Sequence, residues 1–446
     1  MALNVKRPNG TQDVVPNEAY KWHTVESVVR DSAAQFGFKE IRIPTFEETG
    51  LFVRSVGDTT DVVQKEMYTV SSSGDKTYTL RPEGTAGTIR AVIENGILNE
   101  GLPQKVFYLL SCFRHEKAQK GRLREFHQFG CEMLGSASPA ADAEMIALVH
   151  IIMQRLGLRN IELNLNSIGC PECRAKYREA LKAYFEPHRA ELCPTCQERL
   201  EKNPLRLLDC KSAEDQAIAK DAPLITDYLC EECSAHFEGL KKNLAIMGIE
   251  YTVNPRIVRG LDYYTRTVFE FISSDIGSQG TVCGGGRYDG LIETLGGKPT
   301  PALGFAMGLE RILLTLESQG CEFIEEKTCD LYLASMGDKA AEKAVEIASR
   351  MREEGFFVEY DLVGRGLKAQ MKYADKIKAK YVVVIGDSEL ESGTAKLKNM
   401  ASGEQTDISL GDGLLDDFGA QYYEMMLSTD EEFRSFVESF GDGQGE

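Results

Sequence analysis

Apolar positions near the N-terminus repeat at the spacing of one helix face. Within residues 17–37 the repeating residues are Trp22, Val25, Val28, Val29, Ala33 and Phe36, and Gly37 is a typical helix end. A β-prone stretch over residues 39–43 follows and stops at Pro44. We therefore predict a helix over residues 17–37 that leads directly into a short strand.

A second pattern, of period two, lies further along the chain. The apolar run over residues 107–110 leads into a basic loop, and beyond it Phe129 and Cys131 alternate with Gln128, Gly130 and Glu132. The basic side chains of the loop surround Gly121 and are Lys117, Lys120, Arg122 and Arg124. This pattern predicts a strand, a basic loop and a returning strand.

The predicted hairpin has two interpretations. If one face meets a core, the other face brings Arg114, Gln128 and Glu132 together in a cleft, while the lysines and arginines of the loop extend outward. That layout suits a small polyanion below and a nucleic acid above. The alternative is a surface hairpin with a solvated basic turn.

A short strand over residues 78–80 precedes the sequence Arg-Pro-Glu-Gly-Thr and a predicted helix over residues 86–94. Glu83 and Thr85 can together hold an ammonium group, since the carboxylate supplies charge and the hydroxyl a further acceptor. Alternatively, Thr85 only caps the helix and Glu83 is exposed.

Three later segments combine β-prone and glycine-rich sequence. Residues 257–271 contain a turn and a β-prone run, and residues 281–290 are rich in glycine without the Gly-Lys-Ser/Thr ending of a P-loop. Residues 302–311 have the pattern of a strand that passes into a helix. A structural hairpin, a tight turn and an ordinary amphipathic helix are the respective alternatives.

Strands and helices alternate from about residue 329. We predict a βαβαβ unit with a largely parallel sheet. Its strands are predicted over residues 330–334, 357–360 and 381–385, and its helices over residues 338–354 and 366–378. Along the second helix, Lys368, Lys372, Lys376 and Lys380 follow one another at i, i+4 spacing. A polyanion would relieve their mutual repulsion, and a solvated lysine face is the alternative.

Composition and charge narrow the class of protein. The chain of 446 residues is long enough for two or three domains, and no apolar run is long enough to predict a membrane span. The N-terminus has no apolar segment of a secretory signal, so we expect a cytoplasmic protein. A net charge of -18 argues against indiscriminate nucleic-acid binding but permits a local basic groove.

Twelve cysteines are present, and the seven between residues 170 and 233 form a cluster. Two Cys-x-x-Cys pairs at Cys170/Cys173 and Cys193/Cys196 have zinc-ribbon spacing, and we favour these four over sets that include Cys210, Cys230 or Cys233. A reduced, unliganded set and a redox-labile patch are the alternatives. The surrounding segment, about residues 169–240, is charged and helical in pattern and is predicted to be an insertion.

Several of these motifs together resemble a known family. The sequences RPEGTAGTIR and FRHEKAQKGRLREFHQ are similar to the active-site core of histidyl-tRNA synthetases of class II, and RGLDYYTRTVFEF resembles their histidyl-specific signature. The N-terminal helix and strand resemble the first class II motif, and residues 302–311 resemble the third. The loop departs from the family at Lys117-Ala118, where Arg-Pro is frequent, which leaves the contacts to the tRNA acceptor end less defined.

The resemblance implies roles for individual residues. Arg114 and Arg259 would be catalytic cations at the ATP α-phosphate, and Arg114 would also hold the substrate carboxylate. Arg311 would lie over the adenine and reach the γ-phosphate, and Gly304 and Gly308 would permit close packing beneath the nucleotide.

The histidine substrate would be bound by a further set of residues. Tyr264 and Glu132 would satisfy the donor and the acceptor of the imidazole ring, so that isosteres unable to pair are rejected. The remaining residues predicted to contact histidine are Glu83, Thr85, Gln128, Arg259, Tyr263 and Tyr288. Those predicted to contact tRNA are Gln119, Lys120, Arg122, Lys368 and Lys372.

Together, these observations predict an α+β protein with a class II antiparallel catalytic sheet, an inserted helical domain and a C-terminal α/β anticodon-binding domain. The expected domains are residues 1–328, with the insertion at about 169–240, residues 329–425, and an acidic tail over residues 426–446. The expected function is two-step ligation of L-histidine to tRNA(His) in a cytoplasmic homodimer, with ATP, Mg²⁺ and a structural Zn²⁺. A regulatory subunit of ATP phosphoribosyltransferase and a non-catalytic sensor of uncharged tRNA are the alternatives.

Overall fold

The chain forms two compact units, residues 1–324 and 325–446. The structure, a computed structural model, describes residues 5–57, 60, 62–71, 76–208, 210, 212–257, 261, 263–277, 280–324 and 327–429. Each unit has its own hydrophobic core. No helix in these described ranges is long and apolar enough to cross a membrane.

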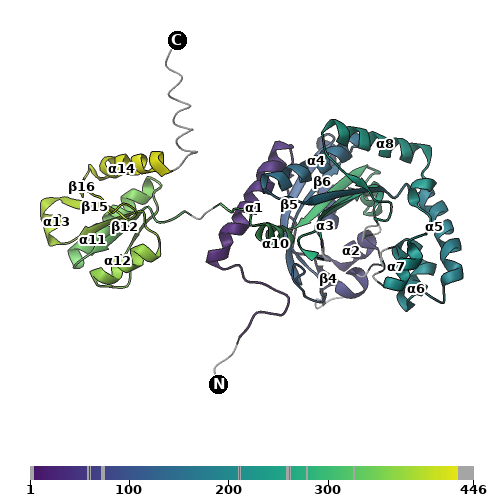
Figure 1. The fold of residues 1–446 in the computed structure, drawn as a ribbon, viewed down its shortest axis with the longest axis horizontal. Helices are drawn as coiled ribbons and strands as arrows, with labels where there is room; N and C mark the ends of the chain where they lie inside the picture. Colours follow the sequence, from purple (N-terminus) through teal and green to yellow (C-terminus); the bar gives the residue numbers. More distant parts are fainter. Residues whose placement is uncertain are drawn as a thin grey trace, which may run out of the picture. The chain divides into compact units, whose positions relative to one another are not determined.

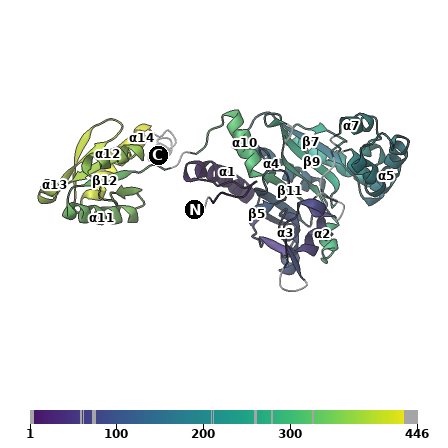
Figure 2. The same cartoon turned by 90° about the horizontal axis from the view of Figure 1, so that it is seen from below.

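An eight-stranded sheet is the centre of the first unit (Figures 1 and 2). Its strands follow the order β1-β5-β6-β11-β10-β9-β7-β8. All neighbours are antiparallel except the two outer pairs, β1 with β5 and β7 with β8. The strands are β1 (Lys39–Glu40), β5 (Gln104–Phe113), β6 (Glu125–Leu134), β7 (Ile161–Ser167), β8 (Thr252–Val253), β9 (Thr265–Ser273), β10 (Thr281–Arg287) and β11 (Ala302–Gly308). The predicted antiparallel hairpin and α+β class are therefore confirmed.

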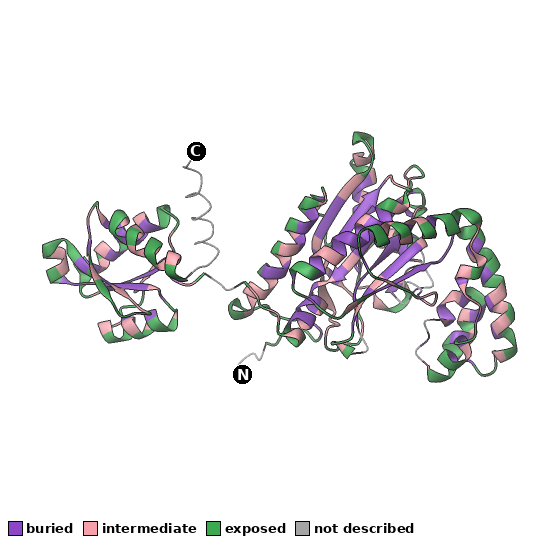
Figure 3. Ribbon diagram, turned by 45° about the horizontal axis from the view of Figure 1, so that its top comes forward, coloured by how far each residue is buried: buried purple, intermediate pink, exposed green. Residues whose placement is uncertain are grey.

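One face of this sheet packs against helices. These are α1 (Pro16–Gln35), α4 (Pro139–Arg155), α8 (Glu231–Ile246) and α10 (Leu309–Gln319). Because side chains alternate along a strand, Phe129, Cys131 and Met133 of β6 enter this core, and Gln128 and Glu132 lie on the opposite face. In Figure 3 the strands are largely buried, whereas the helices expose their outer surfaces.

A small sheet and short helices lie in the same unit. The strands of this sheet follow the order β2-β4-β3. The elements are β2 (Phe46–Glu48), β3 (Thr69–Ser71), β4 (Thr77–Leu80), α2 (Thr49–Val56), α3 (Thr85–Glu94), α9 (Leu291–Thr294), the π-helix η1 (Val62–Glu66) and the 3-10 helix η2 (Ile97–Glu100). Strand β1 is shorter than the predicted 39–43, because the carbonyls of Ile43 and Pro44 accept hydrogen bonds from Arg81.

The segment between β7 and β8 is helical, as its sequence predicts. It contains α5 (Pro171–Phe185), η3 (Glu186–His188), α6 (Pro194–Lys202), η4 (Pro204–Leu207), α7 (Ala213–Ala219), η5 (Ile225–Tyr228) and α8. Figure 2 shows α5 and α7 beyond the edge of the sheet near which β7 and β9 lie. The segment has a small core of its own, to which Tyr177, Leu181 and Phe185 contribute.

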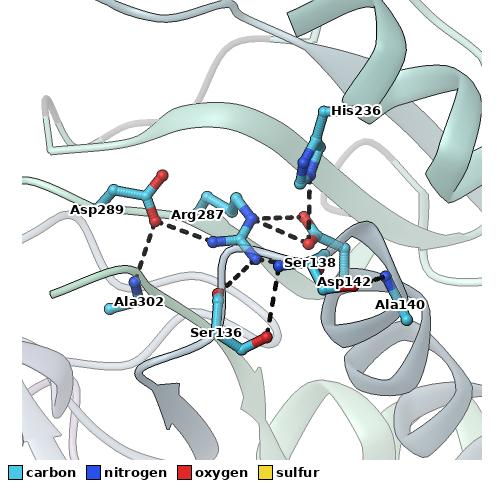
Figure 4. Close-up of polar contacts among 8 residues, drawn as sticks. All are labelled: Ser136, Ser138, Ala140, Asp142, His236, Arg287, Asp289 and Ala302. Carbon is cyan, nitrogen blue, oxygen red and sulfur yellow. Dashed lines mark hydrogen bonds and ion pairs between the residues drawn. The ribbon is translucent and has the colours of Figure 1, made fainter. Parts of the chain in front are cut away.

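A buried ion pair connects the sheet to its helical layer (Figure 4). Nε of Arg287, at the end of β10, donates to both carboxylate oxygens of Asp142 in the first turn of α4, at 2.9 and 3.1 Å. The other guanidinium nitrogens donate to Asp289 and to the carbonyls of Ser136 and Ser138. Each buried charge is thus paired and hydrogen-bonded, which is the condition under which ions are tolerated in a core.

The second unit is a five-stranded sheet in the order β13-β12-β14-β15-β16. Its elements are β12 (Leu331–Ser335), α11 (Asp338–Glu353), β13 (Val358–Tyr360), α12 (Leu367–Lys376), β14 (Tyr381–Ile385), α13 (Asp387–Ser392), β15 (Thr394–Asn399), β16 (Gln405–Ser409) and α14 (Leu414–Thr429). The parallel β12, β13 and β14 confirm the predicted βαβαβ unit. The antiparallel β15 and β16 and the helix α14 were not predicted.

Candidate active site

A cleft of about 390 Å³ lies on the face of the large sheet that the helical core leaves uncovered. Its floor is formed by Gln128 of β6, Gly284 of β10, and Ala306 and Gly308 of β11. Arg114 and Arg311 also line it. Four residues predicted to contact substrates, Arg114, Gln128, Gly308 and Arg311, are therefore brought together.

Three arginines line the cleft. Arg122 lines it together with Arg114 and Arg311. Burial lowers the pKa of Arg311, the charges of Arg122 and Arg114 lower it further, and carboxylates of the same cleft act in the opposite direction. Cations that repel one another in a partly buried cleft favour the binding of a polyanion, since its charge relieves the repulsion.

Arg114 is held in position by its neighbours. Its Nε donates to the carbonyl of Pro82 at 2.9 Å, and its guanidinium lies over the ring of Phe126, 5.3 Å from the ring centroid. These contacts come from the β4–α3 connection and from β6. The guanidinium is therefore oriented before any ligand is present.

The carboxylates of the cleft were not predicted from the sequence. They belong to Glu116, Glu270 and Glu310. Glu310 accepts hydrogen bonds from the backbone N–H of His127 and contacts the ring Nδ1 of His127 at 2.9 Å. Glu270 could have been found, because it is a charged residue within the apolar run Val268–Phe271 of β9. Carboxylate oxygens beside bound phosphates are the usual protein ligands of Mg²⁺.

A fully buried carboxylate, that of Glu132, adjoins the cleft on the same face of β6. Tyr288 donates a hydrogen bond to its Oε2, and the hydroxyl of Tyr108 donates to its Oε1 at 3.2 Å. Burial raises the pKa of Glu132 to about 8, although the hydrogen bonds from the surrounding hydroxyls act in the opposite direction. A strongly perturbed carboxyl group next to a cleft indicates a functional site.

Gly304 is required by this carboxylate. A Cβ at residue 304 would lie 1.7 Å from Oε2 of Glu132, so no side chain fits there. From the sequence, Gly304 was expected to permit packing beneath a nucleotide, but in the structure it lies against the Glu132 side chain.

Glu83 and Thr85 lie close to Glu132, and both influence the pKa of its carboxyl group. Glu83 is buried, and its two carboxylate oxygens accept hydrogen bonds from the backbone N–H groups of Thr85 and Ala86, at 2.6 and 2.9 Å. The alternative of an exposed Glu83 is therefore wrong, because Glu83 itself caps α3. Burial raises its pKa, against the opposing effect of these hydrogen bonds.

Three tyrosines pack together near Glu132, and Tyr288 is the one that donates to its carboxylate. The ring centroid of Tyr263 lies 4.7 Å from that of Tyr264 and 5.6 Å from that of Tyr288. Arg174 of α5 donates to the carbonyl of Tyr264 at 2.9 Å. Arg259, predicted to be a catalytic cation, lies outside the described residues.

The basic loop differs in part from its prediction. Gln119 and Lys120 are exposed in the turn, where Gln119 and Arg122 form a β-bridge. Arg122 does not extend outward, because it lines the cleft and pairs with Glu116. Lys368 and Lys372 are exposed on α12, whereas Lys380 lies beyond the helix and pairs with Asp330 at 2.8 Å.

The grouping of cysteines predicted from their spacing is wrong. Cys170 and Cys173 cluster with Cys230 and Cys233, while Cys193 and Cys196 cluster with Cys210 and Asp215. The reason lies in the connectivity, because α5 and α8 begin side by side at the two ends of the insertion. Residue spacing in the sequence does not contain this information.

Comparisons with known proteins show the family of the chain. A family model described as histidyl-tRNA synthetase matches residues 10–312, and one described as anticodon binding domain matches residues 330–414. The histidine–tRNA ligase of Acetivibrio thermocellus is 55% identical over 403 residues, which is 90% of this chain and 97% of that protein. The histidine–tRNA ligase of Clostridium novyi is 53% identical over 92% of this chain and 97% of its own length.

Solved structures of other proteins are similar to this chain in sequence and fold. The apo histidyl-tRNA synthetase of S. aureus is 40% identical, with a TM-score of 0.80 over 93% of this chain and 99% of that chain. An ATP phosphoribosyltransferase regulatory subunit/histidyl-tRNA synthetase from Bacillus halodurans is 21% identical, with a TM-score of 0.60 over 86% of this chain and 99% of that chain, and shares the fold. The histidyl-tRNA synthetase model covers most of the first unit, and the identity to a histidine–tRNA ligase is high over nine-tenths of the chain. The chain therefore belongs to the histidyl-tRNA synthetase family.

Proposed function

We propose that this chain ligates L-histidine to tRNA(His) in two steps. Histidine and ATP first form histidyl-adenylate with release of pyrophosphate, and the histidyl group then passes to the 3′-terminal ribose of the tRNA. The observation that carries the proposal is the juxtaposition of the buried carboxylate of Glu132 with a cleft that contains three arginines. Relatives 50–55% identical that are named histidine–tRNA ligases support it.

In the first step the histidine carboxylate attacks the α-phosphate. Arg114, with Arg259, neutralises the charge that develops there, and Arg311 holds the departing pyrophosphate. Mg²⁺, when bound, neutralises charge on the phosphates, and the carboxylate of Glu270 in the cleft offers it an oxygen ligand. Because Arg114 is already oriented by Pro82 and Phe126, little reorganisation is needed when ATP binds.

Selection of histidine rests on the pocket around Glu132. In its ionised form the carboxylate accepts an N–H of the imidazole ring, and the hydroxyl of Tyr264 serves the ring from the other side. Glu83 and Thr85 hold the ammonium group, with Gln128, Tyr263 and Tyr288 in the same wall. A competing amino acid without a ring N–H cannot add this donor to those of Tyr288 and Tyr108, and the missing hydrogen bond discriminates against it.

The second step brings the tRNA to the same cleft. Gln119, Lys120 and Arg122 contact the acceptor end, and Lys368 and Lys372 contact tRNA phosphates in the second unit. The domains are residues 1–328, with the insertion at about 169–240, residues 329–425 and the tail 426–446. The enzyme acts as a cytoplasmic homodimer with ATP and Mg²⁺, and the cysteine-rich insertion adds structural Zn²⁺.

The two alternatives are not retained. A regulatory subunit of ATP phosphoribosyltransferase or a non-catalytic sensor has no need for a triad of cleft arginines beside a buried carboxylate. The high identity to histidine–tRNA ligases extends over both units of the chain.

Charging of tRNA(His) with radiolabelled histidine tests the proposal. The unmodified chain is expected to charge it, and Arg114→Ala is expected to do so at least about 100-fold more slowly, because the charge at the α-phosphate is no longer neutralised. Arg159→Ala, at an exposed arginine outside the cleft, is the control. Absence of charging by the unmodified chain, or equal rates for the two variants, contradicts the proposal.

The raised pKa of Glu132 predicts that the free energy of unfolding depends on pH. A glutamate that titrates at about 8 in the folded state and near 4.3 when unfolded stabilises the fold fully only below about pH 4.3, and this stabilisation is lost as the pH rises through about 8. Glu132→Gln has no such titration. Between pH 6 and 9 the unmodified protein should therefore lose about 3 kcal/mol relative to this variant, most of it below about pH 8.

Differential scanning fluorimetry of both proteins without ligands measures this difference as a difference in melting temperature. The gap between Glu132→Gln and the unmodified protein should widen up to about pH 8 and then level off toward pH 9. Glu250→Gln, at an exposed glutamate, should follow the unmodified protein at every pH. A gap that does not vary with pH would show that Glu132 is ionised throughout.

The exposed Lys368 and Lys372 of α12 predict a contact to tRNA phosphates whose strength depends on the salt concentration. Reversal of Lys368 and Lys372 to Glu should weaken tRNA(His) binding at low salt and reduce the slope of log affinity against log salt by about 2. The matched control reverses Lys339 and Lys343 on α11 of the same unit. Filter binding from 50 to 200 mM salt measures both pairs, and an unchanged slope for the α12 pair excludes the contact.

A further inference from the structure

The cysteines of the insertion form two separate groups of four ligands. Cluster A consists of Cys170, Cys173, Cys230 and Cys233, and cluster B of Cys193, Cys196, Cys210 and Asp215. Within each cluster the sulfur and oxygen ligand atoms all lie within 4.8 Å of one another. All eight residues are described and none is exposed to solvent beyond an intermediate degree.

The sulfur separations fit a metal centre. The Sγ atom of Cys170 lies 3.6 Å from that of Cys173 and 4.0 Å from that of Cys230, and those of Cys193 and Cys210 are 3.9 Å apart. Four sulfurs at about 2.3 Å from a tetrahedral Zn²⁺ are about 3.8 Å from one another. A disulfide requires about 2.05 Å, and all of these cysteines are free thiols.

Each Cys-x-x-Cys pair is placed in the same way at a helix start. The first cysteine is the N-cap residue and the second lies in the first turn, at α5, α6 and α8. Backbone N–H groups there are directed toward the sulfurs, as in the 3.0 Å bond from Cys230 N to Cys173 Sγ. Such donors and the helix dipole favour the thiolate form that binds metals.

Cluster B contains an independent indication of a ligand. Asp215 is buried, and its Oδ1 accepts a hydrogen bond from the backbone N–H of Cys193 at 3.0 Å. The other oxygen, Oδ2, is buried and has no hydrogen-bond partner among the described residues. A buried carboxylate oxygen without a donor is costly, and a cation in the group of three sulfurs would satisfy it.

We propose that the insertion holds two structural Zn²⁺ ions, one in cluster A with four thiolates and one in cluster B with three thiolates and the carboxylate of Asp215. Both ligand sets are complete at four, which leaves no position for water or substrate and makes the sites structural rather than catalytic. Sulfur-rich tetrahedral sets favour Zn²⁺ over the hard cations.

The two proposed ions stabilise different parts of the insertion. Cluster A joins the start of α5 to the start of α8 and so closes the insertion at its base. One turn further along α8, His236 lies 3.3 Å from Asp142, the partner of Arg287 (Figure 4). Cluster B lies within the small core of the insertion, to which Cys196 and Cys210 themselves belong. A core of this size is usually supplemented by a metal or by disulfides.

Zinc content per chain tests the proposal without recourse to activity. Full-length protein, purified without chelators and with any affinity tag removed, is analysed by inductively coupled plasma mass spectrometry. Two zinc ions per chain are expected. Cys170→Ser/Cys173→Ser and Cys193→Ser/Cys196→Ser should each retain one, and Cys321→Ser, at a thiol outside both clusters, should retain two.

A donor-conserving variant covers the case in which a serine variant does not fold. Asp215→Cys supplies cluster B with a fourth thiolate and should keep two zinc ions, with a melting temperature no lower than that of the unmodified protein. Less than half a zinc ion per chain in the unmodified protein, iron in place of zinc, or a single ion that both double variants remove would overturn the proposal. The last result would indicate one shared site.

Discussion

The pocket depends on the buried ion pair between Arg287 and Asp142. Both side chains are withdrawn completely from water, so each needs its full set of partners. The structure provides them for Arg287 from the segment after β10, from α4 and from the turn between β6 and α4. Tyr288 follows Arg287 directly and donates its hydroxyl to Glu132. The geometry that fixes Arg287 therefore also fixes one wall of the pocket. Removing one partner of such a pair is strongly destabilising, because the other charge remains buried.

Two neighbouring regions of the proposed active site have different roles in the reaction. The cleft is polar and contains arginines that can neutralise phosphate charge together with carboxylates that can bind Mg²⁺. The pocket beside it is buried and holds a carboxyl group with a raised pKa, which suits a small ligand with ring N–H donors. Both lie on one face of β6, because Gln128 and Glu132 are four residues apart on a strand and the odd-numbered residues between them face the helical core.

Local sequence was sufficient to predict the strands and helices that carry the motifs. The period-two pattern identified β5 and β6, and the resemblance identified Arg114, Glu132, Tyr288 and Arg311 as neighbours. It did not identify Glu116, Glu270 or Glu310, whose approach to the cleft results from the register of distant strands. Arg122 was expected outside and instead pairs with Glu116, since a nearby carboxylate outweighs the preference of an arginine for water. The cysteine clusters were missed for a similar reason, because cluster A joins residues 60 positions apart.

ATP–pyrophosphate exchange against each of the twenty amino acids tests most directly whether the cleft and the residues around Glu132 together activate histidine. It isolates the activation step from the tRNA and tests the cleft and the pocket together. We predict exchange with histidine alone and a strong reduction of it in Glu132→Gln, because the uncharged amide oxygen of glutamine is a weaker acceptor for the ring N–H than the carboxylate. Exchange with no amino acid, or equal exchange with several, would contradict this prediction.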